Sequence, residues 1–415
     1  MNGSVTILTA RVINPIPMWS KQMDTRGADQ DIDSILSTIR SVAGDVSAGL
    51  HEPVFVGNEK AYLVDCVDSG FVSSVGKYVT QFESELANFT GAAHVIAVAN
   101  GTTALHLSLI ALGVKPGQEV LVPAMSFVAT ANAVAHTGAV PHFVDISAET
   151  WGLDPQELRT YLRTAAVQRE GNLVNRETGR TISAIVPMHT LGHPADMAGV
   201  MEVAQEFGLK VLEDAAESLG SYIGDIHTGL LGTLGVFSFN GNKTITTGGG
   251  GAIVTHDAEI AHRIKHLSTT AKVPHLFEFD HDEIGYNYRM PNINAALGVA
   301  QMEQLPGILA NQRKLYRRYE QAFSDAQRVS IKGERAGTLS NFWLQALLIG
   351  PESGIMRNDV IEAALAHNIS VRPLWKPLNT VAAHHSSPSA PTPVAEDLYK
   401  RVVCLPSSAS LVDTW

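Results

Sequence analysis

Short apolar runs alternate with helical segments through the middle of the chain, and this alternation limits the possible folds more than any other feature. We expect strands at residues 95–99, 119–122, 142–144, 182–187 and 209–212. Apolar side chains at helical spacing fall between these strands, at residues 104–112, 126–136 and 197–207. Strand–helix–strand units have right-handed connections and build a mostly parallel sheet that helices cover. The sequence therefore predicts an α/β fold.

Such sheets bind their ligands at the carboxyl ends of the strands. Four chemically distinctive residues fall at those ends in this sequence, namely Thr102, Phe127, His189 and Asp214. We therefore expect a functional site along this edge of the sheet.

Two domains are expected, because 415 residues are too many for one simple core. We predict an N-terminal extension with a helix over residues 1–57, a large domain over 58–305 and a small α+β domain over 306–415. The helix of the extension is predicted to run from Asp31 to Val42. Its apolar side chains share one face, those of Ile32, Ile35, Leu36 and Ile39.

Further elements are predicted on both sides of the alternating region. Helices are expected at 58–68, 78–89, 311–323 and 359–367, and strands at 342–348 and 369–372. The helices at 311–323 and 359–367 and the two strands would form the small domain.

The composition argues against several classes of function. A formal net charge of −11 disfavours a general binder of nucleic acid or of membrane surfaces. The only cysteines, Cys66 and Cys404, are too few for a disulfide framework or a zinc knuckle. No signal-like segment opens the chain and no apolar run is long enough to cross a bilayer. We therefore expect a cytoplasmic protein with no nucleic-acid or membrane partner.

The stretch Gly235–Gly251 places a lysine at the end of a predicted strand. Residues 236–239 alternate as a strand does, and a turn over 240–242 delivers Lys243. Four glycines at 248–251 would then let the backbone pass close to a bulky neighbour. A lysine at a strand end, braced in this way, suits a buried amine that forms a Schiff base.

Two simpler interpretations of this lysine compete. Gly241-Asn242-Lys243-Thr244 approaches a P-loop, but that motif needs glycine where Asn242 and Phe237 stand. A lone surface lysine on a hairpin would be the commoner structure. The residues that precede Lys243 in the chain favour the Schiff base over both.

A predicted strand turns into a helix at Gly101-Thr102-Thr103. Free amides, two hydroxyls and the positive end of the helix dipole make this turn an anion site. The alternative is an ordinary threonine N-cap, which is frequent by itself.

Asp214 ends another predicted strand, twenty-nine positions before Lys243. An aspartate that faces a pyridine nitrogen keeps the nitrogen protonated, and the ring can then accept electrons from a carbanion. Alone, Asp214 could equally be a helix cap. An anion site, a strand-end acid and a strand-end lysine in this order predict pyridoxal 5′-phosphate as the cofactor.

His189 and His193 are four residues apart, as metal ligands can be. Gly192 and Pro194 disfavour a helix there and no third ligand is evident, so we predict no metal site. His189 is better placed in the wall of the pocket. Phe127 could belong to the core, but its loop position suits an aromatic ring stacked on a cofactor.

Five motifs follow one another along the chain. They are Gly-Thr-Thr-Ala-Leu (101–105), Pro-Ala-Met-Ser-Phe-Val-Ala-Thr (123–130), Glu-Asp-Ala-Ala-Glu (213–217), Ser-Phe-Asn-Gly-Asn-Lys (238–243) and Gly-Tyr-Asn-Tyr-Arg-Met (285–290). Together they resemble the DegT/StrS sugar aminotransferases, which are pyridoxal-phosphate enzymes of the aspartate aminotransferase fold. The resemblance covers about residues 50 to 410. It implies a large domain with a mostly parallel, seven-stranded-type sheet and a small α+β C-terminal domain.

Three further segments resemble one branch of that family. They are Leu-His-Glu-Pro (50–53), the stretch 239–251 and Arg-Pro-Leu-Trp-Lys (372–376). The branch makes 4-amino sugars for bacillosamine and legionaminic acid, so the resemblance implies a nucleotide-sugar substrate.

The resemblance also implies the roles of individual residues. Lys243 would hold pyridoxal phosphate and Asp214 would pair with its ring nitrogen. The phosphate would contact Thr102, Ser238 and the amides of Gly101–Thr103, and Asn287 would reach it from the neighbouring subunit of a homodimer with shared active sites. Glu217 stands near the cofactor's phenolic oxygen, where many members have glutamine. The substrate would be bound by Phe71, Ser73, His189, Tyr288, Arg289, Arg372 and Trp375.

The reaction implied is the transamination of a 4-keto-6-deoxy nucleotide sugar, most simply UDP-2-acetamido-2,6-dideoxy-hexos-4-ulose. L-Glutamate would supply the amine and leave pyridoxamine phosphate, while Lys243 would move the proton in both half-reactions. The alternatives are a GDP-sugar 4-aminotransferase of the perosamine type and a non-catalytic, cofactor-bound regulator. A related dehydratase branch is disfavoured because it replaces the lysine with histidine.

Overall fold

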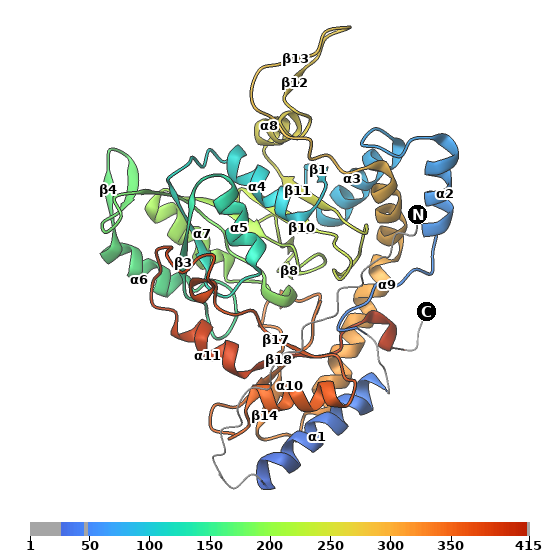
Figure 1. Cartoon of the computed structure of the whole chain (residues 1–415), viewed down its shortest axis with the longest axis vertical. Coiled ribbons are helices and arrows are strands. Elements are labelled where there is room, and N and C mark those ends of the chain that lie inside the picture. Colours follow the sequence, from blue (N-terminus) through green and yellow to red (C-terminus); the bar gives the residue numbers. More distant parts are fainter. Residues whose placement is uncertain (1–25, 45–48, 413–415) are drawn as a thin grey trace, which may run out of the picture.

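The computed structural model describes residues 26–44 and 49–412, and it confirms the predicted α/β class (Figure 1). Seven strands of the large domain form one continuous sheet, in the order β1 (His94–Val98), β11 (Gly251–Thr255), β10 (Leu234–Ser238), β7 (Lys210–Asp214), β6 (Thr181–Ile185), β2 (Glu119–Pro123) and β3 (Val140–Val144). The five strands from β10 to β3 pair in parallel, whereas β11 is antiparallel to both of its neighbours. The sheet is therefore mixed, with a parallel majority as expected.

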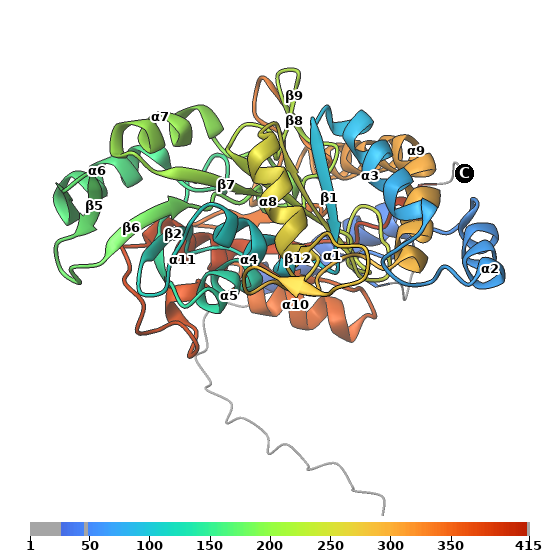
Figure 2. The ribbon, with the colours of Figure 1, turned by 90° about the horizontal axis from the view of Figure 1, so that it is seen from above.

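Helices cover both faces of this sheet (Figure 2). The first face carries α4 (Gly101–Ala111), α5 (Val128–His136) and α8 (Ala258–Ser268). The second carries α3 (Lys77–Thr90), α6 (Pro155–Ala165), α7 (Met197–Phe207) and part of α9 (Asn292–Ala322), with α2 (Glu59–Ser69) lying on α9. Successive strand residues point to opposite faces, so Ile96 and Val98 pack under the first layer and Ala97 under the second.

The small domain is built on the second half of α9 (Figure 1). Its antiparallel sheet has the order β14 (Val329–Ile331), β16 (Ala346–Ile349), β18 (Val402–Cys404) and β17 (Arg372–Pro373). Helices α10 (Arg357–Ala366) and α11 (Pro393–Arg401) pack against this sheet. Helix α1 (Arg26–Ala43) packs on α9 and α10, and the four apolar residues predicted for its inner face are all buried there.

Three expectations for this part of the chain differ from the structure, and one of them is the strand expected at 369–372, of which only Arg372 lies in a strand. The helix expected at 311–323 is only the last part of α9, which runs through Pro306 without a break. Proline removes one backbone donor, but the packing of α9 against α2, α3 and α1 holds the helix together across it. Residue 305, where the division between domains was expected, lies inside this helix. The strand expected at 342–348 begins only at Ala346, because residues 340–345 form an irregular segment.

The remaining elements are short. Strands β4 (Ala166–Arg169) and β5 (Asn172–Asn175) pair with each other and extend the large sheet to nine strands, because β5 also pairs with β6. The others are the three-stranded group β8 (Tyr222–Ile223), β9 (Ile226–His227) and β15 (Thr338–Leu339), and the hairpin β12 (Lys272–Val273) and β13 (Asp280–His281). This last hairpin extends away from the body of the molecule beyond α8 (Figure 1). In the part of the chain that the structure describes, no helix is long and apolar enough to cross a membrane.

Candidate active site

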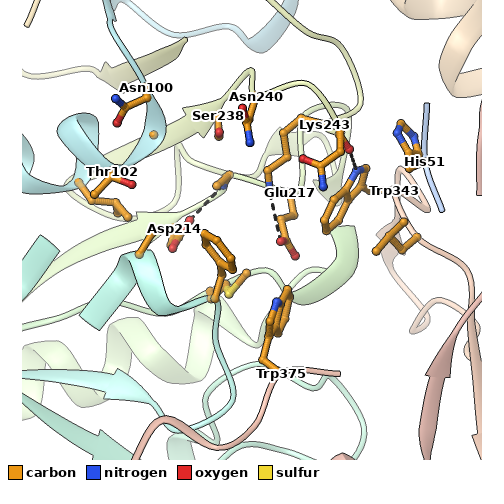
Figure 3. Close-up of a pocket in the computed structure, with 18 of the residues that line it drawn as sticks. His51, Asn100, Thr102, Asp214, Glu217, Ser238, Asn240, Lys243, Trp343 and Trp375 are labelled. Atoms are coloured by element: carbon orange, nitrogen blue, oxygen red, sulfur yellow. Dashed lines mark hydrogen bonds and ion pairs between the residues drawn. The ribbon is translucent and has the colours of Figure 1, made fainter. Parts of the chain in front are cut away.

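A cavity of about 580 Å³ lies where the carboxyl ends of the large-domain strands face the small domain. Nine of the residues predicted for the site line it: Gly101, Thr102, Phe127, Asp214, Glu217, Ser238, Lys243, Arg372 and Trp375. The strand–helix alternation brings these residues together from positions far apart in the chain. Figure 3 shows Lys243 and Glu217 meeting inside the cavity, with Asp214 on one side and Trp343 and His51 on the other.

The anion site at the start of α4 is closely fitted to the end of β10. In the sheet, Gly251 pairs with Val98 on one side and with Ser238 on the other, which brings the α4 turn beside Ser238. A Cβ atom on Gly101 would lie only 2.8 Å from that of Ser238, and one on Gly251 would lie 2.6 Å from the backbone of Asn100. Position 251 therefore requires glycine, because the α4 turn packs against it and leaves no room for a side chain. The bulky neighbour expected for the glycine run is here the protein's own backbone.

Thr103 differs from its prediction as a phosphate ligand. Its amide donates to Asn100 Oδ1 at 2.9 Å, and its hydroxyl donates to the Asn100 carbonyl at 2.8 Å. These bonds form the capping box of α4, in which Asn100 is the N-cap and Thr103 is the third helical residue, so the threonine N-cap named as the alternative is also not what the structure has. The amides of Gly101 and Thr102 are left facing the cavity, because the first amides of a helix have no acceptor within it.

Asp214 ends β7 and its side chain is buried. Its Oδ2 accepts a hydrogen bond from the Thr130 hydroxyl at 2.6 Å, and its Oδ1 accepts one from the Ala216 amide at 3.2 Å. Burial raises the pKa of Asp214, although the bonds from Thr130 and Ala216 and the charge of Lys243 pull it down. A carboxylate in this position is best stabilised by a positive group placed against it in the cavity.

Lys243 follows β10 and points into the cavity with 12% of its side chain exposed. Its Nζ lies 3.1 Å from Glu217 Oε1, and the other oxygen of Glu217 accepts a hydrogen bond from the Leu191 amide at 3.0 Å. Burial raises the pKa of Glu217 while Lys243 lowers it. The lone surface lysine is thereby excluded, since the amine is enclosed and paired.

Aromatic rings and one cation form the opposite wall. The ring centroids of Phe127 and Trp375 are 6.4 Å apart, and the Arg372 guanidinium lies 5.4 Å from the Trp375 ring. Phe127 is 47% exposed, so it is not part of the core. These groups offer flat apolar surface and a positive charge to a ligand.

Seven predicted site residues do not line this cavity, Thr103 and six others. His189 is fully buried, with Nε2 at 2.9 Å from Glu213 and Nδ1 accepting from the Ala195 amide, so it lies behind the site as a structural residue. Arg289 pairs with Glu83 at 3.1 Å, and Tyr288 stacks on Tyr286 at 4.9 Å. Phe71, Ser73 and Asn287 are exposed on other parts of the surface.

Several lining residues were not predicted. They include Leu50, His51, Asn100, Met188, Asn240, Asn242, Trp343 and Leu344. Burial, and secondarily the charge of Lys243, lowers the pKa of His51 to about 4. His51 stands in the quoted segment Leu-His-Glu-Pro, but nothing local in the sequence shows that the segments around residues 51 and 343 both meet Lys243.

Among the described residues, one group could offer three ligands to a metal ion, His266, Asp282 and Glu283. It lies beside the β12–β13 hairpin and outside the cavity. Glu283 is already paired with Arg263 at 2.8 Å, and His266 with Asp282 at 2.7 Å. Exposed acidic groups are common without a metal, so this group does not change the prediction for the site.

Comparison with known proteins gives consistent matches. The model of the DegT/DnrJ/EryC1/StrS aminotransferase family matches residues 55–414. The chain is 36% identical to a putative pyridoxal phosphate-dependent aminotransferase, EpsN, of Bacillus subtilis, over 88% of this chain and 92% of that protein. It is 36% identical to the GDP-perosamine synthase of Escherichia coli O157:H7, over 87% and 93%. A crystal structure of a DegT DnrJ EryC1 StrS aminotransferase from Brucella abortus superposes with a TM-score of 0.77, with 29% identity over 86% of this chain and 91% of that one.

Proposed function

The chain belongs to the DegT/DnrJ/EryC1/StrS aminotransferase family, and we propose that it transfers an amino group from L-glutamate to the C4 ketone of a nucleotide-linked 4-keto-6-deoxy sugar. It is a sugar aminotransferase, and its cofactor is pyridoxal 5′-phosphate. The observation that carries the proposal is the convergence in one cavity of an enclosed lysine, a buried acid and a helix N-terminus.

The residues present fit this cofactor by the chemistry of their donors. The first amides of α4 and the Ser238 hydroxyl would hold its phosphate, because a helix N-terminus stabilises an anion. Asp214 would hold a protonated ring nitrogen. Burial raises the pKa of this acid, and a positive group placed against it would stabilise its charged form. Phe127 offers its ring as a stacking surface, and Lys243 offers the amine for covalent attachment.

Bound pyridoxal phosphate supplies an electron sink for the electrons released when a carbon–hydrogen bond next to nitrogen breaks. The protein's own residues supply the rest of the reaction. Lys243 Nζ takes the proton from one carbon and returns it to another, and Glu217 keeps the amine positioned between these sites. Thr130 would fix the Asp214 carboxylate, so that its negative charge would be available to a bound ring nitrogen.

For the sugar nucleotide we propose UDP-2-acetamido-2,6-dideoxy-hexos-4-ulose. The support is the resemblance of segments 50–53, 239–251 and 372–376 to the bacillosamine and legionaminic acid branch. Arg372 is the cation in the cavity wall that could meet the substrate's phosphates, which the net charge of −11 otherwise repels. A GDP-linked 4-keto sugar is the second candidate, because a GDP-perosamine synthase is 36% identical over most of the chain.

Turnover with UDP- and GDP-linked 4-keto sugars, each with L-glutamate, tests this assignment. The proposal expects an amino sugar from the UDP-linked substrate at a kcat/KM well above that for the GDP-linked one. The reverse order would assign the enzyme to the perosamine type. Conversion of neither substrate would contradict the proposed function.

We also propose a homodimer in which each site is completed by the partner. Leu276, Phe277, Phe279 and Ile284 are all more than three-quarters exposed on and beside the β12–β13 hairpin. Apolar side chains gathered on a projecting element are typical of a protein interface. Asn287 follows this hairpin and lies outside the cavity of its own chain, which suits a residue that serves the partner's phosphate site.

Subunit exchange tests the shared site. Lys243→Ala and Asn287→Ala variants should each be inactive alone, whereas mixed dimers contain one site with both residues and should regain activity. Exchange is checked by size tags on the two variants. Confirmed mixed dimers without activity would contradict the proposal.

A further inference from the structure

Trp343 of the small domain touches the lysine of the large domain. It lies in the irregular segment 340–345 and is 1% exposed, with its indole in the wall of the cavity. Lys243 Nζ lies 4.2 Å from the centre of the Trp343 ring, on the ring's face. The indole Nε1–H donates a hydrogen bond to the Asn242 carbonyl at 2.6 Å, one residue before the lysine. Trp343 thus contacts both the amine and the turn that carries it (Figure 3).

Asn341 ties the same segment to both sides of the lysine. Its Nδ2 donates to the carbonyls of Glu217 and Leu219, each at 2.9 Å, and to Thr244 Oγ1 at 3.2 Å. Its Oδ1 accepts from the Trp343 amide at 2.9 Å. Asn341 is itself buried. One small-domain side chain therefore connects Trp343 with the backbone of Glu217 and with the residue after Lys243.

The backbone between these residues has an unusual conformation. Phe342 has φ of +50°, in the left-handed region that bulky side chains rarely adopt. Its ring is stacked on Tyr316 at 4.0 Å with an interplanar angle of 9°, which holds this conformation in place. Strained residues that the surroundings keep in position cluster at functional sites. Here the conformation turns Asn341 and Trp343 toward the lysine.

The two neighbours of the amine have complementary properties. Glu217 meets it with a carboxylate oxygen at 3.1 Å, and Trp343 meets it with the negative face of an aromatic ring. A protonated amine gains from both, and its position is fixed between them. Such a fixed place matters because the amine must meet the reacting carbon at close range in each half-reaction.

We propose that Trp343 is a positioning residue for Lys243, and that the small domain uses it to hold the catalytic amine in register with Glu217. This inference rests on the proposed transaminase function. It goes beyond that function because it gives the small domain a role in the proton transfer that is exerted through the position of Lys243.

A residue that acts by positioning Lys243 can be distinguished from a residue that only contacts a substrate. Lys243 works in both half-reactions, so a residue that positions it must affect conversion by L-glutamate and conversion by the keto sugar alike. A residue that binds only one substrate would affect one half. The two halves can be followed separately through the absorbance of the cofactor.

Trp343→Phe and Trp343→Leu form the matched pair of variants. Phenylalanine keeps an aromatic face under the amine, whereas leucine removes it, and both lose the bond to Asn242. We expect Trp343→Leu to slow both half-reactions by similar factors, each about 3- to 30-fold, and Trp343→Phe to recover most of the rate. Should the leucine variant fail to fold, Trp343→Met fills the volume without an aromatic face and carries the same expectation.

A spectroscopic titration without substrate provides a second readout. The protonated form of the lysine–cofactor linkage is positive, so losing the ring face should lower the pH midpoint of its absorbance change by about 0.5 unit in the leucine and methionine variants, and not in the phenylalanine variant. Loss in only one half-reaction, or equal loss in the phenylalanine and leucine variants, would overturn the proposal. An inactive wild-type protein would instead contradict the proposed function.

Discussion

The amine of Lys243 lies 3.1 Å from Glu217 Oε1, and only 12% of one side chain and 1% of the other is exposed. Removing two opposite charges from water is costly, and the cost is offset only when they meet in good geometry. Burial raises the pKa of Glu217 while Lys243 and Arg372 lower it. The pair thus places a titratable acid in contact with the amine that we propose performs the chemistry.

Glu217→Gln tests the importance of this charge. Because burial raises the pKa of Glu217 above 4.5, the wild-type rate should fall on the acid side as the carboxylate that pairs with Lys243 becomes protonated. The glutamine variant should lack that acidic limb and should be slower near neutral pH by about 1–2 kcal/mol, or roughly five- to thirtyfold. The rate against pH measures both effects, and Glu202→Gln on the surface is the control. An unchanged acidic limb would contradict this role.

Asp214→Asn should slow both half-reactions by at least about tenfold to a hundredfold. The variant keeps the size of the side chain but cannot stabilise a positive ring nitrogen. Thr130→Val is the matched control, because it removes only the hydroxyl that donates to Asp214 Oδ2 at 2.6 Å. We expect a smaller loss for it, about threefold to tenfold. Single-turnover absorbance measures each half, and equal losses in the two variants would assign the effect to geometry rather than to charge.

Arg372→Ala should weaken the sugar-nucleotide half-reaction selectively. A charge-assisted contact with a phosphate contributes about 1.5–3 kcal/mol, so the expected loss is roughly tenfold to a hundredfold in kcat/KM for that substrate. Conversion by L-glutamate should remain nearly unchanged. Lys376→Ala removes a nearby positive charge that is exposed and outside the cavity, and it is the control. Equal losses of rate in both half-reactions would mean that Arg372 binds the amino donor or has a structural role.

Buried histidines should make the fold sensitive to acid. Burial lowers the pKa of His193 to about 3, with a further contribution from Lys332, and burial lowers that of His227 to about 4. The unfolded chain binds protons near pH 6.5, whereas the native protein does not until its lower pKa values. Stability is therefore full above pH 6.5 and falls as the pH decreases toward 4 or 3.

His193→Leu measures this effect, because leucine cannot take up a proton and fits between the rings of Trp151 and Phe342 that now surround His193. The variant should lose about 2 kcal/mol less stability than the wild type between pH 7 and pH 5. Urea midpoints at the two pH values provide the measurement, with the exposed His256→Leu as control. Parallel pH dependences for the wild type and His193→Leu would contradict the expectation.

Much of the fold was predictable because its signals are local. The alternation of apolar and helical segments located the five strands that were predicted from it, which are β1, β2, β3, β6 and β7. Helix α7 was predicted with its observed bounds. The start of α9 was missed because Pro306 indicates a helix end in sequence, and only tertiary packing carries the helix through it. Elements such as the β4–β5 pair and the β12–β13 hairpin depend on pairings between short, mostly polar segments, which leave little trace in composition.

The residues of the site also divide into those that local sequence signals predict and those that only tertiary packing brings in. Ser238 was inferred from the family resemblance. Lys243 and Asp214 were predictable from their positions, because Asp214 ends a strand, Lys243 follows one, and a parallel sheet collects its functional groups at that edge. His51 and Trp343 were not, because they come from the N-terminal segment and the small domain, and only the packing of the two domains brings them to the lysine. His189 closely follows β6, but its ring turns toward Glu213, and sequence position alone cannot show that direction.

We propose that Lys243 carries the cofactor of a transaminase, and borohydride reduction of the cofactor-loaded protein shows whether it does. Reduction makes the linkage between lysine and cofactor permanent, and peptide mapping by mass spectrometry then locates the added pyridoxyl group. We predict one labelled peptide, the one that contains Lys243, and no label in Lys243→Ala, whereas Lys332→Ala should be labelled like the wild type. A pyridoxyl group on any other lysine, or on none, would contradict the account.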